Sequence, residues 1–376
     1  MTTNSRMEST TESSGITAVN LFSPLTLRMI TLRNRIGVSP MCQYYSKDGF
    51  ADDWHLVHLG SRAVGGAGLV MVEASAVEAR GRITPDDLGI YMDEHIPKLK
   101  QITDFISKFG AIPAIQIAHA GRKGSTKNPW KGGNRHNKQA LSNEEGGYDV
   151  VGPGNEPFSE FSRIPHALSK VEIEEIQEKF VAAAKRSLAA GFKLLEIHSA
   201  HGYLLHSFYS PLSNSRDDEY GGSFENRIRF LLELSTKVRA VWPEELPLSV
   251  RISASDWVEG GWSVEDSVEL AKRLKTLGVD IVDCSSGNIR AGDRYNMQPG
   301  WQVPLAEAVR NGADIPTAAV GMITEAEQAN NIISEGKADL VLLARQMMRD
   351  PYWPYHAAKQ LGVIADTIPL NYSYAL

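Results

Sequence analysis

Short hydrophobic segments recur along this chain, and most of them are nearly continuous apolar runs without polar residues in alternation. Continuous runs of this length are typical of parallel strands that are buried on both faces. We therefore predict eight strands: Arg35–Ser39, Leu69–Ala74, Ile112–Ile117, Lys193–His198, Leu248–Ile252, Ile281–Ser285, Ile315–Ala319 and Leu340–Ala344.

Longer segments between these runs carry apolar residues at helical spacing. In Val171–Ala190 the apolar positions recur every three or four residues, which predicts a helix. Ser263 with Asp266, and Thr324 with Glu327, resemble the residue pairs that cap a helix at its N-terminus. The other predicted helices are Ser223–Ala240, Ser263–Leu277, Thr324–Ser334 and Pro351–Leu361.

The alternation of strands and helices predicts an α/β protein, and eight strands favour a closed (β/α)8 TIM barrel over an open doubly wound sheet. A long polar segment, residues 124–165, interrupts the repeat after the third strand. We expect this loop insertion to lie over the mouth formed by the carboxyl ends of the strands, where barrel enzymes place their active sites. Residues 1–18 are rich in Ser and Thr and predict a disordered tail, which leaves residues 19–376 as one barrel domain.

The composition narrows the range of functions. With 376 residues, of which 42% are hydrophobic and 22% charged, the chain is typical of a globular protein with a large core. Its net charge of −6 argues against binding to nucleic acid or to an anionic membrane. Cys42 and Cys284 are the only cysteines, which argues against a disulfide framework and excludes an iron–sulfur cluster held by cysteines alone. No secretory signal or membrane span is recognisable, so we expect a cytoplasmic protein.

Polar residues gather directly after the predicted strands, which predicts a large polar site at the barrel mouth. Strands seven and eight are followed by Gly321 and Arg345, at the usual phosphate-binding position of this fold. Glycine lets the backbone approach a ligand closely, and arginine binds phosphate through two parallel hydrogen bonds. A turn glycine and a surface arginine would explain each residue alone, but together they favour a phosphate site.

His198 and His201 follow the fourth strand, and Tyr203 comes shortly after them. Two neutral imidazoles at this spacing could donate hydrogen bonds to one carbonyl oxygen; two structural loop histidines are the alternative. Two histidines make a weak case for zinc, so no metal is expected. Tyr203 is a weak acid suited to protonating a basic carbon, unless it is only an aromatic residue at the edge of the site. Arg251, after the fifth strand, requires an anionic partner, which could be a reduced flavin or an internal carboxylate.

Several runs of the sequence resemble the Old Yellow Enzyme family. They are SPMCQYYS, EASAV, QIAHAGRK, HSAHGYLLHSFYSPLSNSRDDEYGGSFENRIRF, VRIS, VGMI and LLARQMMRDPYWP. The resemblance extends from about position 21 to about position 354, and the long run that begins at His198 is highly specific. Cys42 together with Tyr44 is similar to the bacterial branch of xenobiotic-reductase-like and thermophilic-like ene-reductases.

The resemblance implies a tightly bound, non-covalent FMN. Gln116 would bond to the pyrimidine side of the flavin, and Cys42 would lie near its C4=O and tune its reduction potential. His198 and His201 would hold the carbonyl oxygen of the substrate, and Tyr203 would donate the proton. The other implied substrate-binding residues are Tyr44, Lys123, Trp301 and Trp353. The implied FMN-binding residues are Ser39, Pro40, Met41, Cys42, Ala74, Gln116, Arg251, Gly321, Ala344 and Arg345.

The implied activity is that of an ene-reductase, which uses NAD(P)H to reduce the C=C bond of α,β-unsaturated carbonyl compounds. The reductant, NADPH in preference to NADH, would give a hydride to flavin N5 and leave before the activated alkene binds, which is a ping-pong sequence. A homo-oligomer is left open. Some members place an arginine from the C-terminal tail in a neighbouring subunit's site, whereas this tail has no arginine after Arg349 and carries Tyr372 and Tyr374.

Three alternatives are left by the sequence. Dienoyl-CoA reductase-like and trimethylamine dehydrogenase-like enzymes share this type of barrel, but they are larger and carry an iron–sulfur cluster. A non-redox barrel, such as a phosphate-binding aldolase or isomerase, would require a reactive lysine, for which Lys123 is the candidate. A flavin-binding or stress-sensing protein without physiological turnover would bind FMN but reduce alkenes only slowly.

Overall fold

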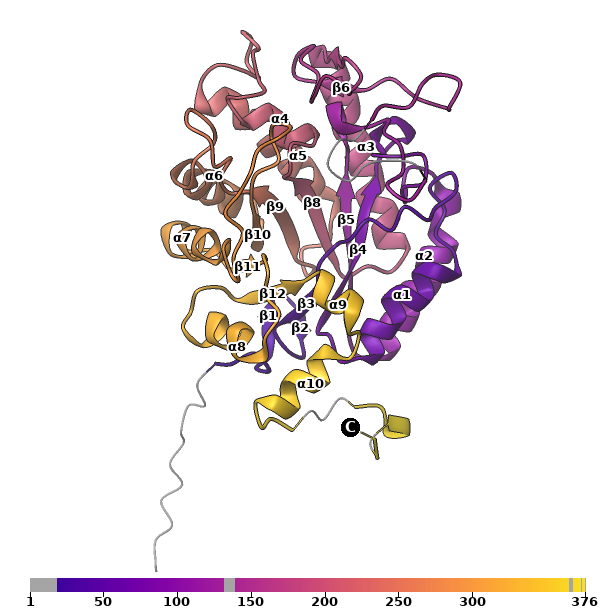
Figure 1. Cartoon of the computed structure of the whole chain (residues 1–376), viewed down its shortest axis with the longest axis vertical. Helices are drawn as coiled ribbons and strands as arrows, with labels where there is room; N and C mark the ends of the chain where they lie inside the picture. Colours follow the sequence, from indigo (N-terminus) through magenta and orange to yellow (C-terminus); the bar gives the residue numbers. More distant parts are fainter. Residues whose placement is uncertain (1–18, 132–138, 365–367, 373, 376) are drawn as a thin grey trace, which may run out of the picture.

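Eight parallel strands form a closed barrel at the centre of the molecule, which confirms the predicted (β/α)8 TIM barrel (Figure 1). The computed structural model describes residues 19–131, 139–364, 368–372 and 374–375, so the tail predicted over residues 1–18 lies outside the described residues. Every predicted strand is present, with bounds that differ from the prediction by at most two residues. In barrel order the strands are β3 (Ile36–Val38), β4 (Leu69–Ala76), β5 (Ile112–Ala118), β8 (Leu194–Ser199), β9 (Leu248–Ser253), β10 (Ile281–Ser285), β11 (Thr317–Ala319) and β12 (Leu340–Leu343).

Helices cover the outside of the barrel (Figure 1). They are α1 (Asp53–Val64), α2 (Ile96–Lys108), α3 (Lys170–Ala189), α4 (Leu204–Tyr209), α5 (Phe224–Val241), α6 (Val264–Thr276), α7 (Val303–Ala313), α8 (Ala326–Ser334), α9 (Arg345–Arg349) and α10 (Trp353–Gln360). Helices α3, α5, α6, α8 and α10 confirm predictions, whereas the other five had no predicted counterpart. Helix α1 shows one reason, because its buried side includes His55, His58 and Arg62 and is therefore not apolar in sequence.

The two predicted capping pairs have different outcomes. In α6 the Ser263 hydroxyl accepts a hydrogen bond from the Asp266 N–H (3.1 Å), and the Asp266 carboxylate accepts one from the Ser263 N–H (3.0 Å). The prediction for Thr324 and Glu327 is wrong, because no side chain caps α8. The Thr324 N–H instead donates to Gln328 Oε1 (3.1 Å), so this turn is held by a later residue of the helix.

The inside of the barrel changes from apolar to polar along its axis. At the amino ends of the strands, aliphatic side chains pack against a hairpin of β1 (Leu25–Leu27) and β2 (Ile30–Leu32), which closes this end. Gly37 leaves room for Leu342, because a Cβ on Gly37 would lie 2.4 Å from Leu342 Cδ2. Side chains alternate along a strand, and further along β5, β8, β9 and β10 the inward positions are polar. They are Gln116, Glu196, Ser249, Arg251 and Asp283.

The loop insertion after β5 lies at the mouth of the barrel, as predicted. It follows the turn η3 (Gly121–Lys123), and its strand β6 (Val151–Gly152) pairs with β7 (His166–Ala167) near the top of Figure 1. Asn128 Nδ2 donates to the Tyr44 carbonyl oxygen (3.1 Å), which ties the insertion to the loop after β3. Among the helices that the structure describes, none has the length and apolar character needed to cross a membrane.

Candidate active site

A pocket of about 310 Å³ opens at the carboxyl ends of β11 and β12. Gly321 lies in its wall with φ +112°, and a Cβ there would come within 2.7 Å of Gln302 Nε2, so this position favours glycine. Arg345 and Arg349 add two guanidinium groups to the wall. A confined cationic pocket of this kind suits a phosphate group. Five of the predicted FMN-binding residues line it together: Ser39, Arg251, Gly321, Ala344 and Arg345.

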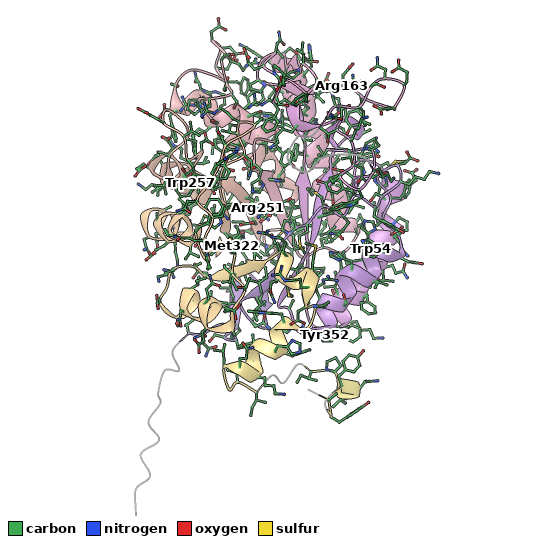
Figure 2. The ribbon with its side chains drawn as sticks, viewed as in Figure 1. Trp54, Arg163, Arg251, Trp257, Met322 and Tyr352 are labelled. Carbon is green, nitrogen blue, oxygen red and sulfur yellow. The ribbon has the colours of Figure 1, made fainter. Side chains whose placement is uncertain are left out.

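Arg251 lies in the middle of the molecule, inside the barrel (Figure 2). Its Nε lies 2.9 Å from Asp283 Oδ2, and the two side chains are 8% and 1% exposed. The internal carboxylate that was one of two predicted partners is therefore present. Arg251 Nε and both carboxylate oxygens of Asp283 are nevertheless buried without a well-formed hydrogen bond among the described residues. Buried polar atoms are normally bonded, so this pair has capacity for a further polar ligand.

Gln116 projects from β5 into the barrel interior and is buried. Its Nε2 donates to Glu196 Oε1 (2.8 Å), and Ser249 Oγ donates to Glu196 Oε2 (2.8 Å). These bonds fix the orientation of the Gln116 amide. The floor of the mouth is thus a polar layer whose side chains hold one another in place.

His198 ends β8, and the tight turn after it brings His201 close to it. The two ring centroids lie 5.2 Å apart, with the planes at 81°. Burial lowers the pKa of both imidazoles well below 6.5, and the charge of Arg251 adds to this effect. Both rings are therefore neutral at pH 7. The Ala200 N–H donates to His198 Nδ1 (3.3 Å), which leaves the proton of the neutral ring on Nε2 as a donor.

The turn that carries His201 and Tyr203 is held by a buried pair that the sequence analysis missed. Gly202 has φ +72°, and its N–H donates to His206 Nδ1 (2.8 Å). His206 Nε2 lies 2.9 Å from Asp256 Oδ1, and both side chains are 0% exposed. His206 could have been identified from the sequence, because it lies in the same family-specific run as His201. Asp256 had no signal, because it follows a different strand.

Lys123 supports the same turn from the other side. Its Nζ donates to the carbonyl oxygens of His201 (2.6 Å) and Asn288 (3.0 Å) and lies 5.1 Å from the centroid of the Tyr203 ring. An ammonium bound to two carbonyls is not the neutral amine that aldolase-type chemistry requires. Lys123 also does not line the small space shared by His198 and Tyr203. It lines the larger pocket beside the insertion instead, so the structure gives it a positioning role, and its predicted substrate contact stays a prediction.

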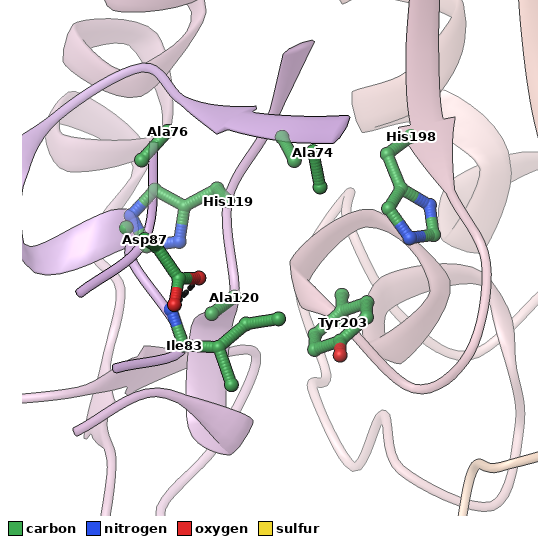
Figure 3. Close-up of a pocket in the computed structure, with 10 residues that line it drawn as sticks. Ala74, Ala76, Ile83, Asp87, His119, Ala120, His198 and Tyr203 are labelled. Atoms are coloured by element: carbon green, nitrogen blue, oxygen red, sulfur yellow. Dashed lines mark hydrogen bonds between the residues drawn. The ribbon is translucent and has the colours of Figure 1, made fainter. Parts of the chain in front are cut away.

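Tyr203 and His198 face a small apolar space (Figure 3). Their ring centroids lie 5.1 Å apart, and both line a cavity of about 10 Å³ together with Ala74 and Asp87. Burial raises the pKa of the Tyr203 hydroxyl well above 10, and nearby Cys42 and Asp87 raise it further. The hydroxyl is therefore protonated over the whole physiological pH range and can serve as a proton donor.

A wider groove of about 630 Å³ begins at the loop after β3, and Met41, Cys42 and Tyr44 line it. The Tyr44 ring meets Trp130 of the insertion edge to face, with centroids 6.3 Å apart. Burial raises the pKa of Tyr44, and the nearby ionisable groups of Cys42 and Tyr203 raise it further. Pro40 lies between this groove and the phosphate pocket in the chain.

The two predicted tryptophans have different positions. Trp301 stacks on Trp257 with centroids 5.8 Å apart, and its Nε1 lies 3.1 Å from the place where Gly321 would carry a Cβ. It therefore lies at the mouth, and its predicted contact with the substrate stays a prediction. The prediction for Trp353 is wrong: its ring is 5% exposed within the core, and its Nε1 donates to the Thr324 carbonyl oxygen (2.9 Å). It starts α10 and packs inward because this short helix buries its apolar face against the outside of the barrel.

Residues 20–363 match the NADH:flavin oxidoreductase / NADH oxidase family. The chain belongs to this family. It is 48% identical over 344 residues to an NADPH dehydrogenase of Geobacillus sp. strain WCH70, and the alignment covers 91% of this chain and 94% of the relative. It is 45% identical over 347 residues to an NADPH dehydrogenase of Bacillus subtilis strain 168, and the alignment covers 92% of this chain and 96% of the relative. The resemblance to the Old Yellow Enzyme family is thereby confirmed.

Solved structures share the barrel. A complex of 2-naphthoyl-CoA reductase with 2-naphthoyl-CoA gives a TM-score of 0.81 at 26% identity over 92% of this chain. The match covers 52% of that chain, so the present chain spans about half of its length. Morphinone reductase gives a TM-score of 0.76 at 23% identity, with 93% of this chain and 92% of that chain covered, which shows a common fold.

The protein is an NAD(P)H-dependent flavin oxidoreductase, and the non-redox barrel is set aside. Its described residues fit an FMN group in two independent places. Gly321 with Arg345 and Arg349 provides a confined cationic pocket for a phosphate. Inside the barrel, Arg251 Nε is buried beside Asp283 without a well-formed hydrogen bond among the described residues, and the Gln116 amide is fixed by Glu196. A guanidinium and an amide are suitable partners for the polar pyrimidine edge of a flavin.

Proposed function

We propose that this protein is an ene-reductase, which uses NADPH to reduce the C=C bond of small activated alkenes such as α,β-unsaturated ketones, aldehydes and imides. The observation that carries the proposal is the arrangement of two neutral imidazoles, the buried His198 and the partly buried His201, with Tyr203 beside them. A neutral imidazole N–H donates to a carbonyl oxygen without adding a charge to the site. Such donors stabilise the negative charge that develops on that oxygen during reduction.

FMN, when bound, supplies the hydride chemistry, while the protein supplies binding, orientation and electrostatics. Gly321, Arg345 and Arg349 would hold its phosphate, and Gln116 and Arg251 would hold its pyrimidine side. Contacts of this number support tight, non-covalent binding. The names of the relatives, which are NADPH dehydrogenases, support NADPH as the preferred reductant.

The chain's own residues position the alkene and complete the reaction. His198 Nε2 donates to the carbonyl oxygen, which draws electrons from the double bond. Tyr203 keeps its proton because burial raises its pKa, and it delivers that proton to the strongly basic α-carbon. Lys123 and the buried His206 hold the turn, which keeps the Tyr203 hydroxyl in a fixed position relative to the His198 imidazole. The reductant and the alkene would use this one mouth in turn, which is the basis for a ping-pong sequence.

A visible spectrum of the purified protein tests the proposal first. We expect a flavin band that bleaches when NADPH is added without oxygen and returns when 2-cyclohexenone is added. A protein that cannot be reconstituted with FMN would overturn the assignment. A band that bleaches with NADPH but returns with the enone only as slowly as in the His198→Ala variant would favour the flavin-binding protein without physiological turnover.

A further inference from the structure

Three ionisable side chains share the barrel interior below the mouth. Glu196, Arg251 and Asp283 project inward from the neighbouring strands β8, β9 and β10, and they are 1%, 7% and 0% exposed. Cross-strand register pairs Asp283 directly with Arg251. The cluster thus contains two carboxyl groups and one guanidinium, and the activity proposed above uses only the guanidinium.

The two carboxyl groups have different partners. Asp283 lies 2.9 Å from Arg251 Nε and makes no well-formed hydrogen bond among the described residues. Glu196 accepts hydrogen bonds from two neutral side chains, Gln116 Nε2 and Ser249 Oγ, both at 2.8 Å. Among the described residues, the guanidinium of Arg251 is therefore paired with Asp283, whereas the hydrogen-bond partners of Glu196 are the neutral side chains of Gln116 and Ser249.

An ionised Glu196 would leave one uncompensated negative charge in the barrel. Burying an isolated carboxylate is costly, and such groups usually take up a proton instead. Burial raises the pKa of Glu196 to about 8, and the charge of Asp283 adds to this while Arg251 opposes it. The other side chains that face it are accounted for. His198, the next inward residue of β8, is neutral, and the positions towards the amino ends of the strands are aliphatic.

We propose that Glu196 is the proton-holding residue of the flavin site: it is the neutral acid at neutral pH, and at alkaline pH it binds a proton when the cofactor is reduced, while Asp283 stays ionised and holds Arg251. The proposal rests on FMN binding as proposed above. Hydride from the nicotinamide coenzyme adds two electrons and one negative charge to the cofactor. At alkaline pH, where Glu196 is ionised before reduction, its carboxylate takes one proton from solvent and becomes the neutral acid, so the charge of the barrel interior is unchanged. Reoxidation by the alkene releases that proton.

The reduction potential of the bound flavin, measured against pH from about 6 to about 9.5, tests this proposal without an activity assay. Below about pH 7 the wild type and Glu196→Gln should have the same slope, because Glu196 is protonated in both redox states. Above about pH 8 one additional proton is bound on reduction of the wild type. Its reduction potential should therefore fall by a further amount of about 30 mV per pH unit, which for two electrons is a tenfold change in the reduction equilibrium constant. Glu196→Gln should lack this extra dependence.

Two further variants provide the controls. Ser249→Ala changes the same cluster but leaves all its ionisable groups, so the extra alkaline slope should persist. Asp283→Asn removes the charge that disfavours ionisation of Glu196 and frees Arg251 to pair with it. The extra slope should then begin at least one pH unit lower. This variant decides the question even when Glu196→Gln does not fold.

The outcomes separate this proposal from the proposed function. If the protein binds FMN but its potential shows no extra alkaline slope, or shows the same slope in Glu196→Gln, Glu196 is not the proton-holding residue and the ene-reductase assignment stands. If the protein binds no FMN, the proposed function fails and this proposal fails with it. An extra slope that Glu196→Gln removes, or that Asp283→Asn moves to lower pH, supports the proposal.

Discussion

The buried carboxylate of Asp256 offers the sharpest test of how the active-site turn is held. It accepts three hydrogen bonds: from His206 Nε2 (2.9 Å), Ser210 Oγ (2.6 Å) and the Trp262 N–H (2.8 Å). Asp256→Ala would leave three buried donors without an acceptor, at about 1–3 kcal/mol each. Removing one partner of a buried pair costs about 3–5 kcal/mol, so we expect a loss of about 3–5 kcal/mol in the free energy of unfolding.

Asp256→Asn is the milder and more informative variant. Asparagine keeps one side-chain oxygen, which can face either His206 or the two donors Ser210 Oγ and the Trp262 N–H. At least one donor therefore loses its acceptor, at a cost of about 1–3 kcal/mol. When the oxygen faces Ser210 and the Trp262 N–H, His206 loses its acceptor and no longer fixes the Gly202 N–H, so the turn with His201 shifts. Because a displacement of about 1 Å can cost about a hundredfold in rate, we expect kcat for enone reduction to fall by about ten- to a hundredfold.

Urea unfolding at a fixed FMN concentration measures the stability change, and steady-state kinetics measures kcat. Asp280→Asn is the matched control, because Asp280 accepts from Arg28 Nε (2.6 Å) and the Leu248 N–H (2.8 Å) at the opposite end of the barrel. It should lose stability but keep its kcat at temperatures where it is folded. An Asp256→Asn protein with wild-type stability and wild-type kcat would refute the reasoning.

Three further substitutions and one pH series test the site. His198→Ala should slow enone reduction by about 100-fold and affect flavin reduction by NADPH much less, as separate half-reactions in stopped flow will show; equal losses would contradict the carbonyl role. Tyr203→Phe should slow turnover by about 100-fold or more with enone binding nearly unchanged, and full activity would mean that another group or water delivers the proton. Gly321→Ala, with its strained φ of +112° and its Cβ within 2.7 Å of Gln302 Nε2, should weaken FMN binding in a fluorescence titration, whereas an unchanged affinity would remove Gly321 from the phosphate site. Because burial holds the pKa of His198 and His201 well below 6.5, affinity for a carbonyl ligand should stay constant from about pH 8 down to about pH 6, and a loss centred on about 6.5 would show that an imidazole titrates there.

The strands could be predicted because their signal is local. A strand buried on both faces has to be a short apolar run, whatever its neighbours are. The helices were harder, because a helix can bury polar groups when the rest of the fold satisfies them. Arg62 of α1 illustrates this: it is 7% exposed, and its Nε donates to the carbonyl oxygen of Met347, which is far away in sequence. The wrong position predicted for Trp353 has the same cause, since only the packed barrel shows which side of α10 faces the core.

The sequence by itself determined the fold class, the order of the eight strands, the family and the residues that gather at one end of the barrel. All of these follow from local patterns or from long specific runs. The tertiary structure decided how those residues are paired. It placed Asp283 against Arg251, His206 against Asp256, and the Lys123 ammonium on two backbone carbonyls. These pairings join separate strands and loops, and the protonation of each group depends on its distance from the others and on its exclusion from water, which no stretch of sequence contains.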